Sequence, residues 1–353
     1  MKHYEGIDFL RGTAVLGVVV YHFFVILNLG NLPLFPYIHY LGLFGVSLFF
    51  VISGFLVYSS FSALYKKYNQ DIKLSLKKYF INRAFRILPA YYFSFLIVLL
   101  LASFTIDANY LYSLSFMKQI LSHLSLTSYF IYKDSGLGFN GAYWTLNIEM
   151  LWYLVVPIIV LYADKTRLIV IAIIVSFFMF YFLDVIYENE LFNFTKSKVS
   201  HLFYYSFQLF PQFVFFGLGV LIYKYNIKLA YKKQSLNFIA SFFTMFVFIL
   251  LSKIGIDTFL MRNIVLFFVA FILFTLLYNQ KFGKFCFISW LGKISYSIYL
   301  WHFIILVIMN KSGILNLVSL WSTVVLYTVF LLTISSMSYY FIEEKGLDMK
   351  NKL

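Results

Sequence analysis

The sequence predicts an all-α integral membrane protein, a bundle of about ten transmembrane helices with both termini in the cytoplasm. Its 353 residues are 62% hydrophobic and 12% charged, with a mean hydropathy of +0.85, far from the composition of soluble proteins. No charged residue occurs between Arg11 and Lys66, a stretch long enough for two spans of about 20 residues each. The basic residues also gather in alternate connecting segments.

Ten apolar ranges are long enough to cross a bilayer, namely 12–30, 41–62, 87–106, 142–162, 168–186, 205–223, 236–252, 261–278, 294–310 and 318–341. With a cytoplasmic N-terminus, the inner segments hold 21 Lys and Arg residues and the outer segments hold seven. This is the asymmetry of the positive-inside rule, and it indicates a multi-pass protein of the cytoplasmic (plasma) membrane. Anionic lipid headgroups therefore account for the net charge of +14, and we expect no nucleic-acid partner.

The segment 107–141 is apolar enough to resemble a further span, but Lys118 and His123 interrupt it. Counting it as a span would invert every later loop and leave 15 basic residues inside against 12 outside. We therefore expect an outer loop with an interfacial or re-entrant helix. The stretch Lys133–Gly141 has the composition of a turn.

The most basic segment, 63–86, predicts a short amphipathic helix on the inner surface that leads into the third span. We expect one membrane domain over 1–345 and a short cytoplasmic tail over 346–353. The first apolar run lacks a small-residue cleavage site, so we expect no cleavable signal peptide. The lone Cys286 excludes an internal disulfide and is expected to pack in the core.

Three ionisable side chains are predicted to share one depth in the bilayer. His22 lies eleven residues after Arg11 on the same helix face, about 16 Å further along the axis. Glu149 is about 10 Å below the outer edge, and His302 is about 12 Å above the inner edge. In a core about 30 Å thick, all three fall near the centre. Ionisable groups there are costly and usually functional, and a His–carboxylate pair is a common general base.

Structural explanations compete with each of these assignments. His22 could be a packing histidine bonded to a carbonyl, and Glu149 could make a structural hydrogen bond between helices. His302, beside Trp301, could be an interfacial or packing residue.

Arginines mark the inner mouth of the predicted bundle. Arg83 and Arg86 are three residues apart, which places both guanidinium groups on one helix face. Paired guanidinium groups suit bidentate capture of phosphate, although positive-inside anchoring would also explain them. Asp8, three residues before Arg11, is a suitable partner to hold that side chain. A cationic mouth joined to a buried acid–base level fits either a phosphate-bearing acyl donor or a proton-coupled anion transporter.

Five motifs in order resemble the acyltransferase family 3, integral membrane enzymes that O-acylate, mostly O-acetylate, surface carbohydrates. The resemblance covers about residues 1–345. The opening pattern Asp-x-Leu/Phe-Arg-Gly, with Arg-x10-His, is present as Asp8–Gly12 through His22. The other motifs are Phe49–Phe55, Arg83–Arg86 leading into Pro89, Trp144–Tyr153, and Ser295–His302 with Tyr339–Glu343.

This resemblance implies roles for individual residues. Arg11, Arg83 and Arg86 would hold the phosphates of acetyl-CoA as acyl donor, and His22 would be the general base, with an acyl-histidine as the less favoured variant. Glu149 would orient His22 or bind the acceptor. The hydroxyl of Ser53 could serve as a nucleophile, but a Ser-Gly pair beside aromatic residues more often marks a close contact between helices. We expect no metal ion.

The expected function is transfer of acetyl from cytosolic acetyl-CoA to an extracytoplasmic glycan or lipid-linked sugar, in contact with membrane lipids. Longer relatives carry an SGNH-type hydrolase domain for which 353 residues leave no room, so transfer would go directly to the acceptor or to a separate protein. The alternatives are a proton-coupled transporter or exporter of an anionic or sugar substrate, and a non-catalytic scaffold. The acceptor hydroxyl, the acyl group and the choice between a monomer and a homo-oligomer are not determined by the sequence.

Overall fold

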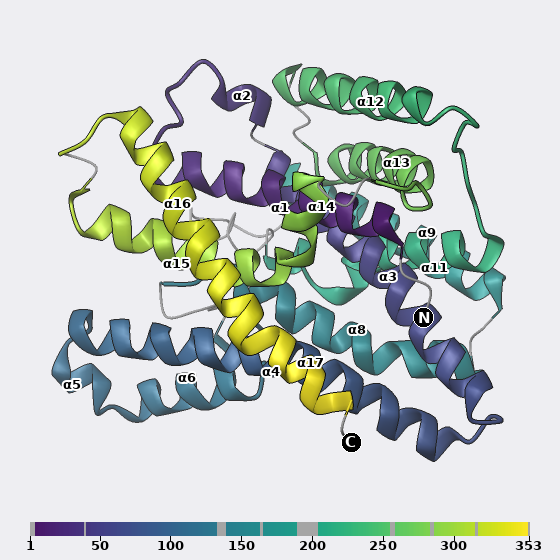
Figure 1. The fold of residues 1–353 in the computed structure, drawn as a ribbon, viewed down its shortest axis with the longest axis horizontal. Coiled ribbons are helices and arrows are strands. Elements are labelled where there is room, and N and C mark those ends of the chain that lie inside the picture. Colours follow the sequence, from purple (N-terminus) through teal and green to yellow (C-terminus); the bar gives the residue numbers. More distant parts are fainter. Residues whose placement is uncertain are drawn as a thin grey trace. The chain divides into compact units, whose positions relative to one another are not determined.

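The structure is a computed structural model that describes residues 4–38, 40–132, 139–162, 165–188, 204–254, 258–282, 286–314 and 317–351. In this part of the chain all regular secondary structure is helical (Figure 1). Nine helices among the described residues are long and apolar enough to cross a membrane, or ten if the bent pair α14 (Phe287–Lys293) and α15 (Ser295–Lys311) counts as one span. The prediction of an all-α membrane protein with about ten spans is confirmed. Most of the predicted turn at Lys133–Gly141 lies outside the described residues.

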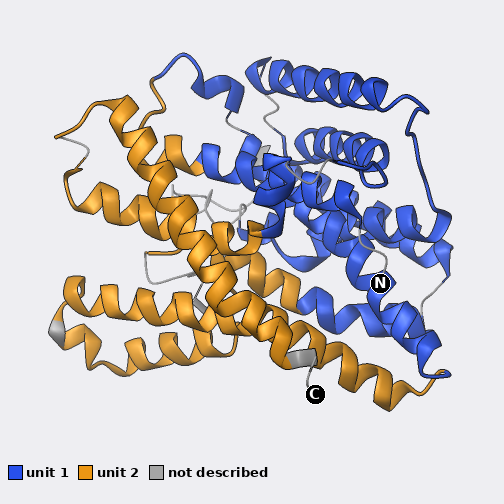
Figure 2. Cartoon of the chain, in the orientation of Figure 1, with its two compact units in different colours: residues 1–21, 32–69, 151–293 blue, residues 22–31, 70–150, 294–353 orange. Residues whose placement is uncertain are grey.

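The chain forms two compact units (Figure 2). Unit 1 comprises residues 1–21, 32–69 and 151–293, and unit 2 comprises residues 22–31, 70–150 and 294–353. Two helices contribute to both units, α1 (Glu5–Ile26) and α8 (Tyr143–Tyr162).

Unit 1 is held together by helices that approach closely at glycine residues. At the crossing of α3 with α11, a Cβ atom on Gly54 would overlap the Phe216 carbonyl, and one on Gly219 would overlap the Val51 carbonyl. Small residues permit such close packing between membrane helices. The helices of this unit, besides parts of α1 and α8, are α2 (Phe35–Ile38), α3 (Leu41–Lys67), α9 (Thr166–Glu188), α11 (Leu209–Tyr225), α12 (Gln234–Ile254), α13 (Phe259–Leu277) and α14 (Phe287–Lys293).

Unit 2 is organised around one long helix, α4 (Ile72–Thr105), against which α15 and α17 pack. The helix α6 also lies on α4, because the Tyr91 hydroxyl donates to the His123 carbonyl at 2.9 Å and Phe95 stacks on the His123 ring at 5.0 Å. The other elements are α5 (Ala108–Leu111), α6 (Leu114–Leu124), α7 (Ser128–Tyr132), α15 (Ser295–Lys311), α16 (Leu320–Ser338), the π-helical turn η2 (Tyr339–Glu343) and α17 (Glu344–Asn351).

The basic segment 63–86 differs from its prediction. It does not form a separate surface helix, since α3 continues to Lys67 and α4 then runs unbroken for 34 residues. Asp71 starts α4 as its N-cap, accepting from the Leu74 N–H at 2.9 Å. Pro89 lies inside this helix and cannot donate to the Phe85 carbonyl. Gly346 of α17 packs against this carbonyl and the Pro89 ring, so most of the predicted tail 346–353 belongs to a docked helix.

The segment 107–141 contains three short helices in its described part, the longest of which, α6, has 11 residues. At 1.5 Å per residue, such a helix covers about half of a bilayer core. The prediction that this segment does not cross the membrane is consistent with its absence from the candidate spans of the described chain.

Candidate active site

Two histidines meet in unit 2. Nδ1 of His22, near the end of α1, lies 3.3 Å from Nε2 of His302, in the middle of α15, and the two ring centroids are 5.1 Å apart. His302 is completely buried, whereas His22 is partly exposed. Phe303 packs edge-on against the His22 ring at 5.3 Å. The structure therefore brings together two of the three residues that the sequence placed at one depth.

The backbone determines where the protons of this pair lie. Nδ1 of His302 is 2.8 Å from the Tyr299 carbonyl oxygen. Because a carbonyl only accepts, this nitrogen carries the proton, and Nε2 of a neutral His302 is then an acceptor. A charge on a ring without solvent contact would be costly, which favours the neutral form. His22 therefore donates through Nδ1, and the lone pair of a neutral His22 lies on Nε2.

The start of α8 fixes Tyr299. The Tyr299 hydroxyl hydrogen-bonds to Oγ1 of Thr145 at 2.8 Å and donates to the Ala142 carbonyl at 3.3 Å. Next to it, Nδ2 of the fully buried Asn140 donates to the Leu300 carbonyl at 2.9 Å. These bonds tie α15 to α8, so the carbonyl that sets the His302 tautomer is held in place.

Glu149 joins the same cluster through two tyrosines. It lies on α8, is partly exposed, and interacts electrostatically with the hydroxyls of Tyr79 and Tyr299. The Tyr299 ring in turn packs against His302, with centroids 5.5 Å apart. His302 is the neighbour of His22 at Nδ1, and the role of Glu149 in orienting His22 or binding the acceptor stays a prediction.

The two arginines of α4 have different neighbours. The Arg83 guanidinium lies 5.8 Å from the centroid of the Tyr79 ring, which is the ring that also interacts with Glu149. Arg86 interacts electrostatically with Tyr339 of the π-helical turn. Both arginines are partly exposed, so their guanidinium groups are open to a ligand.

The π-helical turn contains a buried carboxylate. Glu343 is 4% exposed and accepts from the Ser297 hydroxyl at 3.1 Å, on the first turns of α15. Such turns are rare and frequently occur at functional sites. Here the turn connects α4, through Arg86 and Tyr339, with the helix that carries His302.

Arg11 and its predicted partner lie in unit 1. Nη1 of Arg11 is 4.0 Å from Oδ1 of Asp8, in agreement with the expected pairing. The adjacent Gly12 explains part of the opening motif, because a Cβ atom there would overlap the Ile288 carbonyl of α14. Gly292 of α14 makes the reciprocal approach to the backbone of Asp8.

Ser53 also lies in unit 1, directly before Gly54 at the crossing of α3 with α11. It is buried, with 7% of its surface exposed. This position favours the packing interpretation over a nucleophile.

Sequence reasoning did not single out the residues that surround the histidine pair and Glu149. Tyr299 and Thr145 lie within the family motifs but were assigned no role. Tyr79 and Asn140 were not recognised as candidates. Tyr327, whose hydroxyl donates to the His302 carbonyl at 3.4 Å, was likewise missed. A buried tyrosine or asparagine in an apolar helix was the available sign, since such groups require a partner.

Comparison with known proteins settles the family. Residues 4–340 match the family described as "Acyltransferase domain". The chain belongs to this acyltransferase family. Nearly all of its described residues, including the histidine pair and both arginines of α4, lie within the matched range.

Individual relatives agree with this assignment. The chain is 28% identical over 316 residues to a protein of Acidianus two-tailed virus, provisionally named an acetyltransferase, covering 87% of this chain and 84% of that protein. A Bacillus subtilis (strain 168) protein provisionally named a peptidoglycan O-acetyltransferase is 30% identical over 183 residues, 49% of this chain and 26% of that protein.

A Staphylococcus aureus (strain COL) protein provisionally named an O-acetyltransferase is 40% identical over 90 residues, 26% of this chain and 13% of that protein. The matches thus cover only about a quarter or less of the bacterial relatives' length. No solved structure matches the chain.

Proposed function

We propose that this protein is an O-acetyltransferase of the cytoplasmic membrane, and that His22 is its general base. The observation that supports this most strongly is the His22–His302 contact, with Nδ1 of His302 directed at the Tyr299 carbonyl. In an acyltransferase, a base must take a proton from the acceptor hydroxyl as it attacks the donor carbonyl. The hydrogen-bond chain leaves the lone pair of a neutral His22 on Nε2, where it can perform this step.

The reaction balances with this single base. Nε2 of His22 takes the proton of the acceptor hydroxyl, whose oxygen forms the new ester bond as the carbon–sulfur bond of the thioester breaks. His22 is then an imidazolium, stabilised by its Nδ1–H bond to His302. It returns the proton to the departing thiolate and is neutral again.

The donor is proposed to be acetyl-CoA, whose phosphates require cationic side chains. Arg83 and Arg86 lie on one face of α4 and are partly exposed, as bidentate phosphate contacts require. For Arg11, which lies in unit 1, the same role rests on the family resemblance.

The acceptor is proposed to be a hydroxyl of a surface glycan or a lipid-linked sugar, in line with the bacterial relative named for peptidoglycan O-acetylation. Glu149 supports this assignment because a carboxylate next to the tyrosine hydroxyls of the cluster is suited to accept hydrogen bonds from a sugar.

The test is to compare surface glycans from cells with and without the protein by mass spectrometry. We expect an increment of about 42 Da, one acetyl group, that is lost on treatment with mild base. The variant His22→Ala should abolish the increment, whereas the control His39→Ala should retain it. Proton-coupled substrate flux without acetylation would instead indicate the transporter, and full acetylation by His22→Ala would indicate a scaffold.

A further inference from the structure

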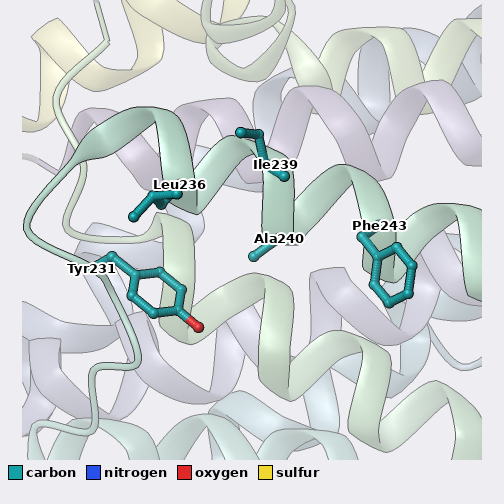
Figure 3. A pocket seen from close by; sticks show the side chains of 5 residues that line it. All are labelled: Tyr231, Leu236, Ile239, Ala240 and Phe243. Carbon is teal, nitrogen blue, oxygen red and sulfur yellow. The ribbon is translucent and has the colours of Figure 1, made fainter.

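A groove opens on the surface of unit 1 beside α12. It has a volume of about 410 Å³ and is lined by Tyr231, Leu236, Ile239, Ala240 and Phe243. Figure 3 shows the rings of Tyr231 and Phe243 on either side of Ala240, whose small side chain forms the floor. Apart from the Tyr231 hydroxyl, every lining side chain is apolar. The groove therefore offers an apolar surface on which a hydrocarbon chain can pack.

The groove is built by the fold of the connecting segment before α12. The buried Asn237 clamps the backbone of Tyr231, accepting from its N–H at 2.7 Å and donating to its carbonyl at 3.0 Å. A two-bond clamp by a buried amide fixes the segment against the first turn of α12. These hydrogen bonds to the backbone of Tyr231 fix the position from which its ring extends.

Exposed lysines flank this groove along the chain. Lys228, Lys232 and Lys233 are all exposed in the segment 226–233, which contains no acidic residue. Gln234 donates to the Lys281 carbonyl at 2.6 Å, which brings a fourth exposed lysine to the same end of α12.

Two carboxylates of α1 lie near this end of unit 1. Glu5 accepts from the Phe282 N–H at 2.8 Å, so its charge is engaged with the backbone next to Lys281. Asp8 is 4.0 Å from Arg11, which balances its charge. Among the described residues at this end of α12, the four lysines therefore leave a positive excess.

The position of the segment 226–233 points to a lipid. It connects two candidate spans, which end at Tyr225 and begin at Gln234, so it lies at the level of the headgroups. From Leu236 to Phe243 the groove follows α12 for about 10 Å towards the hydrocarbon core. A ligand that satisfies both ends has an anionic head and an apolar tail.

We propose that this groove and its lysines form a binding site for an anionic phospholipid, with an acyl chain between Tyr231 and Phe243 and the phosphate among Lys228, Lys232 and Lys233. The exposed lysines that flank Tyr231 in the chain distinguish it from a surface that any lipid tail covers. This inference does not depend on the acyl-transfer chemistry.

Native mass spectrometry of the detergent-purified, delipidated protein provides the test. Phosphatidylglycerol and phosphatidylcholine with identical acyl chains are titrated separately. We expect the first phosphatidylglycerol to bind at least tenfold more tightly, because lysines near a membrane surface each contribute about 1 kcal/mol. Equal affinities for phosphatidylglycerol and phosphatidylcholine would overturn the proposal, since the groove would then bind acyl chains without regard to the headgroup.

Two variants locate the site. Lys232→Gln/Lys233→Gln is expected to weaken the first phosphatidylglycerol about 30-fold, the product of two such lysines. The control Lys66→Gln/Lys67→Gln removes an equally exposed lysine pair from the end of α3 and should leave this affinity unchanged. Equal losses in both variants would mean that net charge, rather than this site, attracts the lipid.

A larger side chain in the groove tests whether the lipid acyl chain binds there. Ala240→Leu should weaken phosphatidylglycerol binding by roughly fivefold or more, because the added carbons occupy the floor. The matched control is Ala172→Leu, a partly exposed alanine on α9, which should have no effect. Unchanged binding by Ala240→Leu, or binding of inorganic phosphate in competition with the lipid, would contradict the acyl-chain assignment.

Discussion

Each of the two units contains a pair of ionisable groups with at least one buried member, and the two pairs differ in what their hydrogen bonds do. In unit 1, Asp184 and Arg262 are 7% and 6% exposed. In unit 2, His302 is fully buried, and its partner His22 is partly exposed. By burial alone, both pairs would be candidates for a functional site in a membrane protein.

The Asp184–Arg262 pair in unit 1 stabilises the fold. The Asp184 carboxylate accepts from the Phe259 and Leu260 N–H groups, at 2.6 and 2.8 Å, at the start of α13. Arg262 lies 4.9 Å from the Phe259 ring and interacts electrostatically with Asp184. The carboxylate oxygens cap a helix and balance a cation, which is a structural role.

The hydrogen bonds of the pair in unit 2 set proton positions instead, which agrees with the proposed role of His22. One ring is fixed by a carbonyl, and the second ring is fixed by the first. The proton positions are therefore set, and a basic nitrogen is presented by the more exposed member. If His22 is the base that we propose, the destination of the hydrogen bonds, rather than burial, separates the reactive pair from the structural one.

The largest effect is expected for His22→Ala. Loss of a general base lowers turnover by about 100-fold or more, so acetylation should become undetectable with expression and thermal stability unchanged. Transfer of labelled acetyl to cell-surface material measures this. Residual activity within about threefold of wild type would remove the distinction between the pairs.

The matching change in unit 1 should act on stability instead. Asp184→Ala removes two bonds from the start of α13 and leaves Arg262 without its carboxylate, which we expect to cost about 3 kcal/mol or more. Thermal unfolding in detergent would show the loss. The milder control Thr258→Ala removes the second cap of α13, on the Met261 N–H, and should cost about 1 kcal/mol.

If Asp184→Ala kept full thermal stability but lost activity per folded molecule, the assignment of a structural role to this pair would be wrong.

Two variants of His302 sharpen the orienting role. His302→Leu removes the acceptor for the His22 Nδ1–H and should lower kcat about 30-fold with little change in KM. His302→Gln offers an amide oxygen in its place and should recover about tenfold of that loss. Equal activity of the two variants would show that His302 only fills space.

The smallest effect is expected at the donor end. Arg83→Lys keeps the charge but loses bidentate geometry, which should raise the KM for acetyl-CoA about tenfold and leave the acceptor KM unchanged. Steady-state kinetics with each substrate varied in turn separates the two. An unaltered donor KM would remove the phosphate role from Arg83.

Helical geometry explains why much of this site could be predicted. The rise per residue is fixed, so the depth of His22 and His302 followed from their positions in apolar runs, and the structure places them in contact. The one-turn spacing of Arg83 and Arg86 was equally certain once both lay on a helix.

The rest depended on how the helices rotate about their axes and pack. The depth argument could not show that Tyr299 presents its carbonyl to His302, or that Glu149 lies beside tyrosines. The basic segment 63–86 was misread because its charges suggest a surface helix. The Asp71 cap and the α17 contact at Pro89 instead allow one continuous α4.

The tautomer of His22 tests the central claim most directly. Nitrogen-15 NMR of histidine-labelled protein in lipid nanodiscs, with His22→Ala and His302→Ala used to assign the two rings, reports which nitrogen of each ring carries the proton. We predict that both neutral rings are protonated at Nδ1, with the lone pair of His22 on Nε2. A proton on Nε2 of neutral His22 would contradict the account, because the proposed base would then have no lone pair to offer the acceptor.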